Sequence, residues 1–250
     1  MVANGRRREV ILSTWGFVPA RGGSKGVPGK NLRLVGGKTL VELAVRSGLE
    51  AGLEGVLIST DDDRIAETAV RAGATHLGPR PSSLSSDKSH MFGAYKHGLN
   101  QLQESGKDVS GLVSLLPTNP LRSAATVRST VKKLEDNYDW VFSVSEMEHH
   151  PYRAMTLSEE SCAPFFPLSA ETMWANRQEL PSIFRFNGVT IAGKAKNILE
   201  NDEYDIDGLG TFETRVGYVL TSQQEAVDID TELDLEWANF LISRREGKHF

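Results

Sequence analysis

The sequence has almost no cysteine and no long hydrophobic run. Cys162 is the only cysteine among 250 residues, which excludes an intramolecular disulfide and a cysteine-ligated metal cluster and is typical of a reducing compartment. No apolar run approaches the length that spans a membrane, and the N-terminus lacks the apolar core of a secretory signal. These absences predict a soluble, cytoplasmic protein that does not bind membranes.

Positive charge is also scarce. The 28 lysines and arginines are outnumbered by 33 aspartates and glutamates, which gives a net charge of −5. A general nucleic-acid-binding surface requires the opposite balance, so no nucleic-acid partner is expected. A basic segment within this acidic chain instead predicts a small anionic ligand.

A glycine-rich loop at residues 18–31 is such a segment, and it follows an apolar, strand-like stretch. It reads Val-Pro-Ala-Arg-Gly-Gly-Ser-Lys-Gly-Val-Pro-Gly-Lys-Asn and carries three cations, Arg21, Lys25 and Lys30. Glycine allows backbone N–H groups to turn toward a ligand, and it lets the ligand approach the main chain. Together with the cations, this predicts a site for a nucleotide polyphosphate.

Two common phosphate-binding patterns do not match this loop. A Walker A loop needs glycine five residues before its Gly-Lys pair and serine or threonine after it, where this sequence has Ser24 and Asn31. The dinucleotide pattern G-x-G-x-x-G fails because Gly22 and Gly23 are adjacent and Ser24 follows. A basic, solvated turn without a ligand is the remaining alternative, and its composition would be unusual for a turn alone.

Strand-like and helix-like segments alternate along the chain at the spacing of an α/β domain. The predicted strands cover residues 10–18, 55–60, 111–116, 140–144, 189–192 and 216–220. The predicted helices cover residues 38–54, 61–73, 87–106 and 124–137, with an amphipathic helix at 233–245. This order predicts a three-layer fold with a mostly parallel sheet, whose ligand lies beyond the carboxyl ends of the strands.

A single domain is expected at residues 8–250, with residues 1–7 disordered. Residues 146–185 break the pattern, because they have no clear period and are rich in aromatic, histidine, proline and methionine residues. This composition predicts either an arm that packs on a partner subunit or a long active-site loop. His149 and His150 in this region are expected to have a structural role or to lie at the rim of the site.

Short motifs follow the loop in a fixed order. They are Ser59-Thr60-Asp61-Asp62, Arg80-Pro81 with Leu84 and Asp87, Pro117-Thr118, Pro120-Leu121-Arg122, His150-Pro151, Arg177-Gln178 with Leu180-Pro181, Asn187-Gly188, and Val227-Asp228-Ile229-Asp230-Thr231 with Asp234-Leu235. With the loop, this ordered set resembles the acylneuraminate cytidylyltransferases, the CMP-sialic acid synthetase family, over roughly residues 10–243. The loop and the Asp-Ile-Asp-Thr motif are its specific parts.

The resemblance implies a nucleotide-diphospho-sugar transferase fold, which is Rossmann-like, with a dimerisation arm in the irregular region. It also implies CTP as nucleotide donor, Mg²⁺ as cofactor and a homodimer as the assembly. The implied reaction joins CTP to the anomeric hydroxyl of a nine-carbon 2-keto sugar acid. Its products are the CMP-sugar and pyrophosphate.

Asp228 and Asp230 form the candidate metal site. Their i, i+2 spacing on an extended segment directs both carboxylates to one side, and Mg²⁺ takes oxygen ligands that it shares with substrate phosphates. The same residues are placed to cap a helix that begins near Glu232, with Thr231 as a local cap. Spacing alone favours neither interpretation, whereas the resemblance favours the metal.

Nucleotidyl transfer depends mainly on positioning and charge neutralisation. Arg21 and Lys25 are expected to hold the β- and γ-phosphates, with Lys30 nearer the α-phosphate. Asp230, or an oxygen species on the metal, is the hypothesised base. These four residues, Arg21, Lys25, Lys30 and Asp230, form the predicted catalytic set.

Base and ribose recognition is expected from Asn31 and Arg80. A buried Arg80 that only supports the proline-rich loop is an alternative, as is Asp61 serving only as a helix cap. The full nucleotide-binding prediction is Ala20, Arg21, Gly22, Gly23, Ser24, Lys25, Lys30, Asn31, Arg80, Asp87 and Ser89.

The sugar site departs from the family pattern. Leu116 stands where relatives that use N-acetylneuraminate have glutamine, Asn119 replaces a serine, Ile191 an aromatic residue, and Arg153 a lysine. Arg177 is retained as a candidate for the sugar carboxylate. The predicted set is Leu116, Thr118, Asn119, Arg153, Arg177, Gln178 and Ile191. Because hydrogen-bond partners are lost, a different nonulosonate is expected, such as a legionaminate- or pseudaminate-type sugar.

Two other functions are compatible with these observations. The chain could be a nucleotide-binding regulatory module without sugar chemistry, although the intact Asp228/Asp230 pair argues against this. It could also be a transferase of the same fold that uses another nucleotide or an eight-carbon sugar acid.

Overall fold

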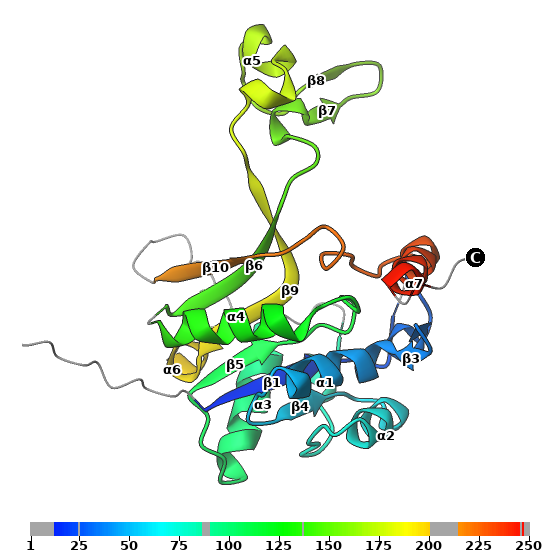
Figure 1. The fold of residues 1–250 in the computed structure, drawn as a ribbon, viewed down its shortest axis with the longest axis vertical. Coiled ribbons are helices and arrows are strands. Elements are labelled where there is room, and N and C mark those ends of the chain that lie inside the picture. The colour runs from blue at the N-terminus through cyan, green and yellow to red at the C-terminus, as the bar shows by residue number, and fades with distance from the viewer. Residues whose placement is uncertain are drawn as a thin grey trace, which may run out of the picture.

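A six-stranded sheet of order β10-β6-β9-β5-β1-β4 forms the centre of the computed structural model, which describes residues 13–24, 26–86, 91–136, 138–200, 215–245 and 247 (Figure 1). Its strands are β1 (Thr14–Pro19), β4 (Val56–Ser59), β5 (Gly111–Ser114), β6 (Trp140–Glu146), β9 (Phe184–Lys194) and β10 (Val216–Leu220). β1 pairs in parallel with β4 and β5, and β10 pairs in parallel with β6. The prediction of a mostly parallel sheet is confirmed.

Helices cover both faces of this sheet (Figure 1). They are α1 (Leu40–Glu50), α2 (Asp63–Arg71), α3 (Met91–Glu104), α4 (Ala124–Glu135) and α6 (Ala195–Glu200). The helix α7 (Glu232–Arg245) lies beside the sheet, and η1 (Lys30–Leu32) and η2 (Ser82–Leu84) are 3₁₀ turns. Side-chain caps explain where three of them begin: Thr39, Asp62 and Ser123 accept backbone N–H groups at the starts of α1, α2 and α4. Among the described helices, none is long and apolar enough to cross a membrane.

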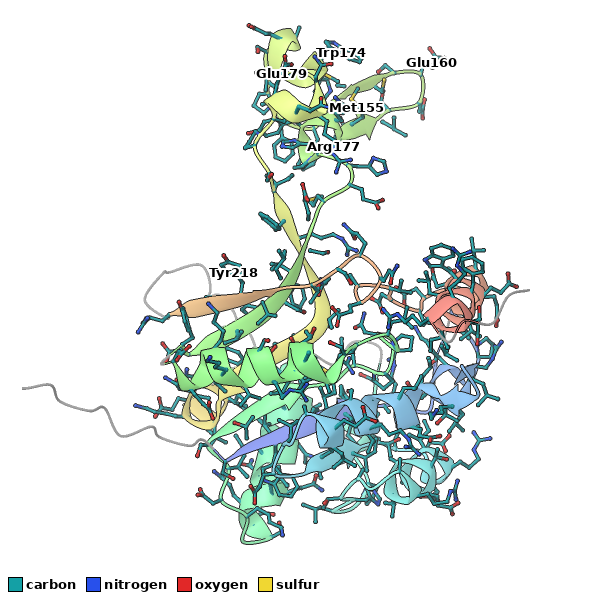
Figure 2. The ribbon with its side chains drawn as sticks, in the orientation of Figure 1. Met155, Glu160, Trp174, Arg177, Glu179 and Tyr218 are labelled. Atoms are coloured by element: carbon teal, nitrogen blue, oxygen red, sulfur yellow. The ribbon has the colours of Figure 1, made fainter. Side chains whose placement is uncertain are left out.

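An arm leaves the sheet between β6 and β9 and extends away from the body (Figures 1 and 2). It contains η3 (Pro151–Arg153), a hairpin of β7 (Met155–Leu157) and β8 (Cys162–Pro164), α5 (Ala170–Trp174) and η4 (Arg177–Glu179). β6 and β9 remain paired as far as Glu146 and Phe184. Because β9 returns from this excursion, it runs antiparallel to both β6 and β5.

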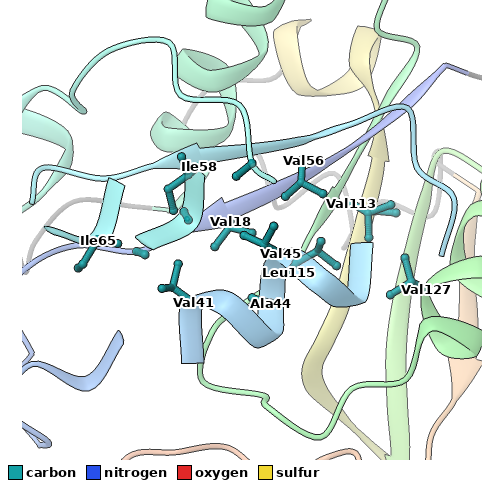
Figure 3. Close-up of a cluster of buried hydrophobic side chains, with 14 of the residues drawn as sticks. Val18, Val41, Ala44, Val45, Val56, Ile58, Ile65, Val113, Leu115 and Val127 are labelled. Carbon is teal, nitrogen blue, oxygen red and sulfur yellow. The ribbon is translucent and has the colours of Figure 1, made fainter. Parts of the chain in front are cut away.

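Two apolar layers hold the helices on the sheet. Along β1, Trp15 and Phe17 face α3 and α6, while Val18 faces α1, α2 and α4, as expected for alternating side chains on a strand. Figure 3 shows the second of these layers, in which Val41 and Val45 of α1 pack against the strands. The C-terminal ends of β1, β4 and β5 therefore meet at one edge of a rigid sheet.

A third apolar cluster joins the glycine-rich loop to the C-terminal helix. It contains Val27, Val35, Leu40, Ile229, Leu235 and Ala238, and the short hairpin of β2 (Leu34–Val35) and β3 (Lys38–Thr39) lies within it. The helix predicted at residues 233–245 is present as α7, but the prediction that this helix is amphipathic is wrong. Trp237 and Phe240 lie on its exposed side with stacked rings 5.3 Å apart, so apolar side chains occupy both sides of the helix.

Candidate active site

The glycine-rich loop begins where β1 ends and is fastened to the loop that follows β4. Ala20 N donates to Ser59 O at 3.0 Å, and Gly22 N donates to the Asp61 carboxylate at 2.8 Å. Asn31 closes the loop from the other end, since its Nδ2 donates to Arg21 O at 2.8 Å. Asp61 therefore shapes the loop, and its neighbour Asp62 caps α2 in place of the predicted Asp61.

Glycine is required in this loop for close approach. A side chain at Gly26 would collide with the backbone carbonyl of Asp230, so the loop lies directly against the segment that carries the two predicted metal ligands. Gly29 has a φ of 62°, which lets the chain turn sharply into η1. The loop thus brings residues from both ends of the sequence together.

A cavity of about 390 Å³ opens beside this loop, at the carboxyl ends of the strands, as the parallel sheet predicts. It is lined by Pro19, Arg21, Ser24, Gly26, Lys30, Asn31, Arg80, Met91, Leu116, Pro117, Thr118 and Asp230. Eight of these were predicted as site residues: Arg21, Ser24, Lys30, Asn31, Arg80, Leu116, Thr118 and Asp230. Met91 was missed, because a methionine at a helix start carries no chemical signal in a sequence.

Lys30 and Asp230 form an ion pair at the cavity wall. Lys30 Nζ lies 3.0 Å from Asp230 Oδ1 and donates to Ile229 O at 2.6 Å. The Lys30 side chain is only 13% exposed, whereas that of Asp230 is 74% exposed. Lys30 is therefore held in place by protein oxygens, while the carboxylate remains open to a ligand.

Asp228 lies two residues before Asp230, and its carboxyl group has a raised pKa. Desolvation by the surrounding protein raises its pKa above the ordinary aspartate value, although the residue as a whole is exposed. A hydrogen bond from Thr118 and the charge of Lys30 oppose this rise in pKa, and the charge of Asp230 adds to it. Asp230 is therefore close enough to Asp228 for its charge to influence the pKa of that carboxyl group.

The helix-cap interpretation of Asp228 and Asp230 does not hold. Asp234 accepts from Asp230 N at 3.1 Å and from Thr231 N at 2.7 Å, and Thr231 Oγ1 accepts from Asp234 N at 3.3 Å. The start of α7 is thus capped by Thr231 and Asp234. The side chains of Asp228 and Asp230 are not its caps.

The donor set at this position suits Mg²⁺. The part of the chain that the structure describes contains no group of three or more histidine, cysteine, aspartate or glutamate residues that could hold a metal. Mg²⁺ is commonly bound by one or two carboxylates together with substrate phosphates and waters. Asp228 and Asp230, beside a cationic loop, match that requirement, whereas a metal that needs a complete protein cage would not be held.

Arg80 lines the cavity from a buried position. Its Nε donates to Ser59 Oγ at 2.9 Å and its Nη2 to Ser59 O at 2.6 Å. The pKa of Arg80 is lower than usual, mainly because the side chain is buried. The charge of Arg21 also lowers this pKa, whereas the charge of Asp61 opposes the change. The guanidinium is thus locked onto the end of β4 rather than onto the proline-rich loop.

The predicted sugar residues do not gather in one place. Leu116 and Thr118 line the cavity. Ile191 lies within β9, opposite Phe142 and Ser114, and is not part of the cavity lining. Asn119 is buried and also does not line the cavity.

The remaining sugar candidates lie on the arm. Arg177 and its neighbour Gln178 are in η4, far above the body (Figure 2). Arg153 ends η3, and its Nη2 donates to Ala175 O at 2.9 Å within the arm. Within one chain, therefore, the structure does not bring these three residues to the cavity.

Arg122 has a structural role that the sequence motif did not reveal. It is buried, and its guanidinium donates to Val189 O at 2.5 Å and to Leu116 O at 2.7 Å. Burial lowers the pKa of Arg122 to about 9, and the charge of Glu225 opposes this. By holding the Leu116 carbonyl, Arg122 fixes the loop that forms one wall of the cavity.

Several predictions fall outside the described residues or beside the cavity. Lys25, Asp87 and Ser89 lie outside the described residues, as do residues 1–7. Ala20, Gly22 and Gly23 belong to the loop without lining the cavity.

Comparison with known proteins shows the family to which the chain belongs. Residues 15–161 match the family model described as Cytidylyltransferase. The chain is 30% identical to CMP-N,N'-diacetyllegionaminic acid synthase of Legionella pneumophila, over 88% of this chain and 91% of that protein. It is 28% identical to pseudaminic acid cytidylyltransferase of Campylobacter jejuni, over 90% and 94% of the two chains.

A solved structure shows the same fold. CMP:2-keto-3-deoxy-manno-octonic acid synthetase in complex with CTP superposes with a TM-score of 0.63 at 16% identity, covering 93% of this chain and 99% of that one. This confirms the predicted nucleotide-diphospho-sugar transferase fold. The family match covers more than half of the sequence and includes the loop, Arg80 and the Leu116–Thr118 wall of the cavity. The chain belongs to the cytidylyltransferase family.

Proposed function

We propose that this protein activates a nonulosonate, a nine-carbon 2-keto sugar acid, with CTP to give the CMP-sugar and pyrophosphate. The observation that carries the proposal is the cavity in which Lys30 and Asp230 meet beside the glycine-rich loop. Cationic and acidic groups together suit a nucleotide triphosphate bound with a divalent cation. The names of the Legionella and Campylobacter relatives support a nonulosonate as the acceptor.

The chemistry requires an oxygen of the sugar to attack the α-phosphorus while pyrophosphate leaves. Arg21 and Lys30 stabilise the charge that grows on the phosphate oxygens, and the N–H groups of the glycine-rich loop orient the triphosphate. Lys25, from the same loop, is proposed to join them. Asn31 and Arg80 are proposed to bind ribose and base, and Asp230 to accept the proton of the attacking hydroxyl.

Asp228 and Asp230 are proposed to hold Mg²⁺. When bound, the ion would supply Lewis-acid stabilisation of the phosphate oxygens. The chain itself contributes the direction of the two carboxylates, which is set by burial of Ile229 between them and by the bond from Lys30 to the Ile229 carbonyl.

The acceptor pocket is proposed to prefer a deoxygenated or differently N-substituted nonulosonate of the legionaminate or pseudaminate type. Leu116 places an aliphatic side chain on the cavity wall where an amide would offer hydrogen bonds. A polar sugar group left unpaired against it would lose about 1–3 kcal/mol of binding.

The arm is proposed to complete the site of a second copy in a homodimer. It exposes Leu157, Phe165 and Trp174 at 82%, 60% and 77%, which is unusual for an element without a partner. It also carries Arg153, Arg177 and Gln178, which the cavity of the same chain lacks. Both features are explained if the arm packs across another subunit.

One assay tests the reaction. Pyrophosphate release is measured with CTP, Mg²⁺ and a panel of 2-keto sugar acids that includes legionaminate, pseudaminate, N-acetylneuraminate and an eight-carbon acid. Release with a legionaminate- or pseudaminate-type sugar is expected to be fastest. CTP binding without release from any sugar would indicate a nucleotide-binding module, and preference for the eight-carbon acid would contradict the proposed acceptor class.

A further inference from the structure

A brace of hydrogen bonds joins the loop after β5 to the segment that carries Asp228 and Asp230. Asn119 Nδ2 donates to Val227 O at 3.0 Å, and Ile229 N donates to Thr118 O at 2.9 Å. Asn119 and Val227 are 108 positions apart in the sequence, so this contact exists only in the folded chain. The segment is thereby tied to the loop after β5 as well as to Lys30, which donates to the Ile229 carbonyl.

Asn119 is the buried member of this brace. It is 1% exposed, and its Oδ1 has no hydrogen-bond partner among the described residues. Because the Val227 carbonyl can only accept, the amide nitrogen must face it, which settles the orientation of the side chain. All of the hydrogen bonding that the structure shows for this amide is therefore directed at the aspartate segment.

The surroundings of Asn119 leave it little freedom to move. Asn119 N donates to Leu116 O at 3.2 Å, and Arg122 N donates to Asn119 O at 3.4 Å. Behind it, a side chain at Gly188 would lie 3.6 Å from Asn119 Oδ1 and 3.3 Å from Leu116 Cδ1. A rigid amide of this kind transmits its position to the carbonyl that it holds.

We infer that Asn119 is a positioning residue for the carboxylates of Asp228 and Asp230, acting through the Val227 carbonyl, and not a ligand of the sugar. This inference rests on the proposed function of those carboxylates. Groups that orient metal ligands without touching the metal commonly change metal affinity by about 10–100-fold when they are removed. Asn119 occupies such a place, because it binds the carbonyl of Val227, the residue directly before Asp228.

The test measures divalent-metal binding without turnover. Mn²⁺ is titrated into the full-length protein with CTP present and no sugar, and free Mn²⁺ is read from its electron paramagnetic resonance signal. Asn119→Ala is expected to raise the Mn²⁺ dissociation constant by about tenfold. Asn119→Asp keeps the shape but presents only acceptors to the carbonyl, so the same weakening is expected.

Asn187→Ala is the matched control. Asn187 is also a buried amide, but its Nδ2 donates to Thr221 Oγ1 at 2.7 Å and its Oδ1 accepts from Ser143 Oγ at 2.7 Å, so neither bond is made to the segment that carries Asp228 and Asp230. Its loss is expected to lower the melting temperature and leave Mn²⁺ binding unchanged. Weakened Mn²⁺ binding in this control as well would show a general effect of destabilisation and overturn the inference.

Three further results decide the question. Wild-type Mn²⁺ affinity in Asn119→Ala, combined with a raised KM for the sugar, would make Asn119 a sugar ligand and overturn the inference. If the alanine variant does not fold, unchanged binding in Asn119→Asp has the same force. A wild-type protein without Mn²⁺ binding in the presence of CTP would also overturn it. If only the pyrophosphate assay fails, the proposed function is wrong, but the comparison of Mn²⁺ binding between the Asn119 and Asn187 variants still tests this inference.

Discussion

Lys30 Nζ lies 3.0 Å from Asp230 Oδ1, although the two residues are 200 positions apart in the sequence. One belongs to the loop after the first strand and the other to the segment before the last helix. The third apolar cluster, with Val27 on one side and Ile229 on the other, brings these parts of the chain together. Burial of apolar side chains thus creates the charged site next to them.

Replacing Lys30 by methionine should lower kcat by about 10²-fold or more, because a fixed cation that faces developing phosphate charge is removed. The side chain keeps its approximate length, so the loss is electrostatic. Lys196→Met is a suitable control, since Lys196 is 76% exposed and lies 3.9 Å from Glu200 on α6. Pyrophosphate release gives kcat for both variants. A Lys30→Met enzyme as fast as the control would remove Lys30 from catalysis.

Asp228 should show opposite effects on stability and activity. Its pKa is raised in the folded protein, so the folded state binds its proton more tightly than the unfolded state does. The charged carboxylate is therefore destabilising at neutral pH, and this penalty disappears as the pH falls through the raised pKa toward the ordinary aspartate value. Asp228→Asn should melt higher than wild type at neutral pH.

The same Asp228→Asn variant should lose metal-dependent turnover. Thermal unfolding at a series of pH values, without CTP, is the measurement of stability, and the gain should shrink toward acid. A variant that melts lower than wild type at neutral pH would show that the carboxylate stabilises the fold. Asp234→Asn is the contrasting change. Hydrogen bonds from Thr231 and from backbone N–H groups hold the pKa of Asp234 below its usual value, although burial raises it. Loss of the Asp234 charge should therefore be destabilising.

Asp61 and Asp62, which are adjacent after β4, should differ in what their substitution affects. Asp61 accepts the N–H of Gly22, so Asp61→Ala should loosen the glycine-rich loop and raise the KM for CTP. Asp61→Asn keeps an acceptor and should restore most of the affinity. Asp62 caps α2, and Asp62→Ala should cost about 1 kcal/mol of stability with little change in KM. CTP binding by calorimetry and chemical denaturation distinguish the two; a reversed pattern would contradict the assignment.

How much of the fold the sequence predicted depended on how local the signal was. The three aspartates at residues 61–63 predicted the start of α2 because helix capping is decided by a few neighbouring residues. β9 was predicted as a strand, but its antiparallel place between β5 and β6 follows from the path of the arm, which no local pattern encodes. Likewise, the exposed Trp237 and Phe240 of α7 cannot be separated from core residues by periodicity.

The site shows the same division. Arg21, Lys30 and Asn31 were found because the loop concentrates glycine and cations in one short segment, and all three line the cavity. Asn119 was expected at the sugar, but its partner Val227 lies 108 positions away and only the folded chain reveals it. Arg122 reaches Val189 across 67 positions for the same reason. Motifs identify the residues, whereas long-range contacts decide which of them touch a ligand.

The proposed exchange of arms predicts complementation between two inactive variants. Asp230→Asn removes a group of the cavity, and Arg177→Ala removes a group of the arm. If the arm serves the partner's cavity, mixed dimers contain one intact site, and a random mixture should recover about a quarter of wild-type activity. If Arg177 serves its own chain, no mixed dimer has an intact site. Subunit exchange followed by pyrophosphate release separates these outcomes, and activity that stays at the level of the single variants would rule out the exchanged arm.

Leu116→Gln should change which sugar the enzyme prefers. Leu116 is half-buried on the cavity wall, and its carbonyl is held by Arg122 Nη2 at 2.7 Å, so a new side chain would start from a fixed backbone. A glutamine amide there offers a donor and an acceptor, which should raise kcat/KM for N-acetylneuraminate relative to a legionaminate- or pseudaminate-type sugar. One recovered hydrogen bond corresponds to about a tenfold change in this ratio. Leu116→Met, which preserves an apolar wall, is the control. An unchanged ratio in the glutamine variant would mean that Leu116 does not face the sugar, and selectivity would then have to come from the arm.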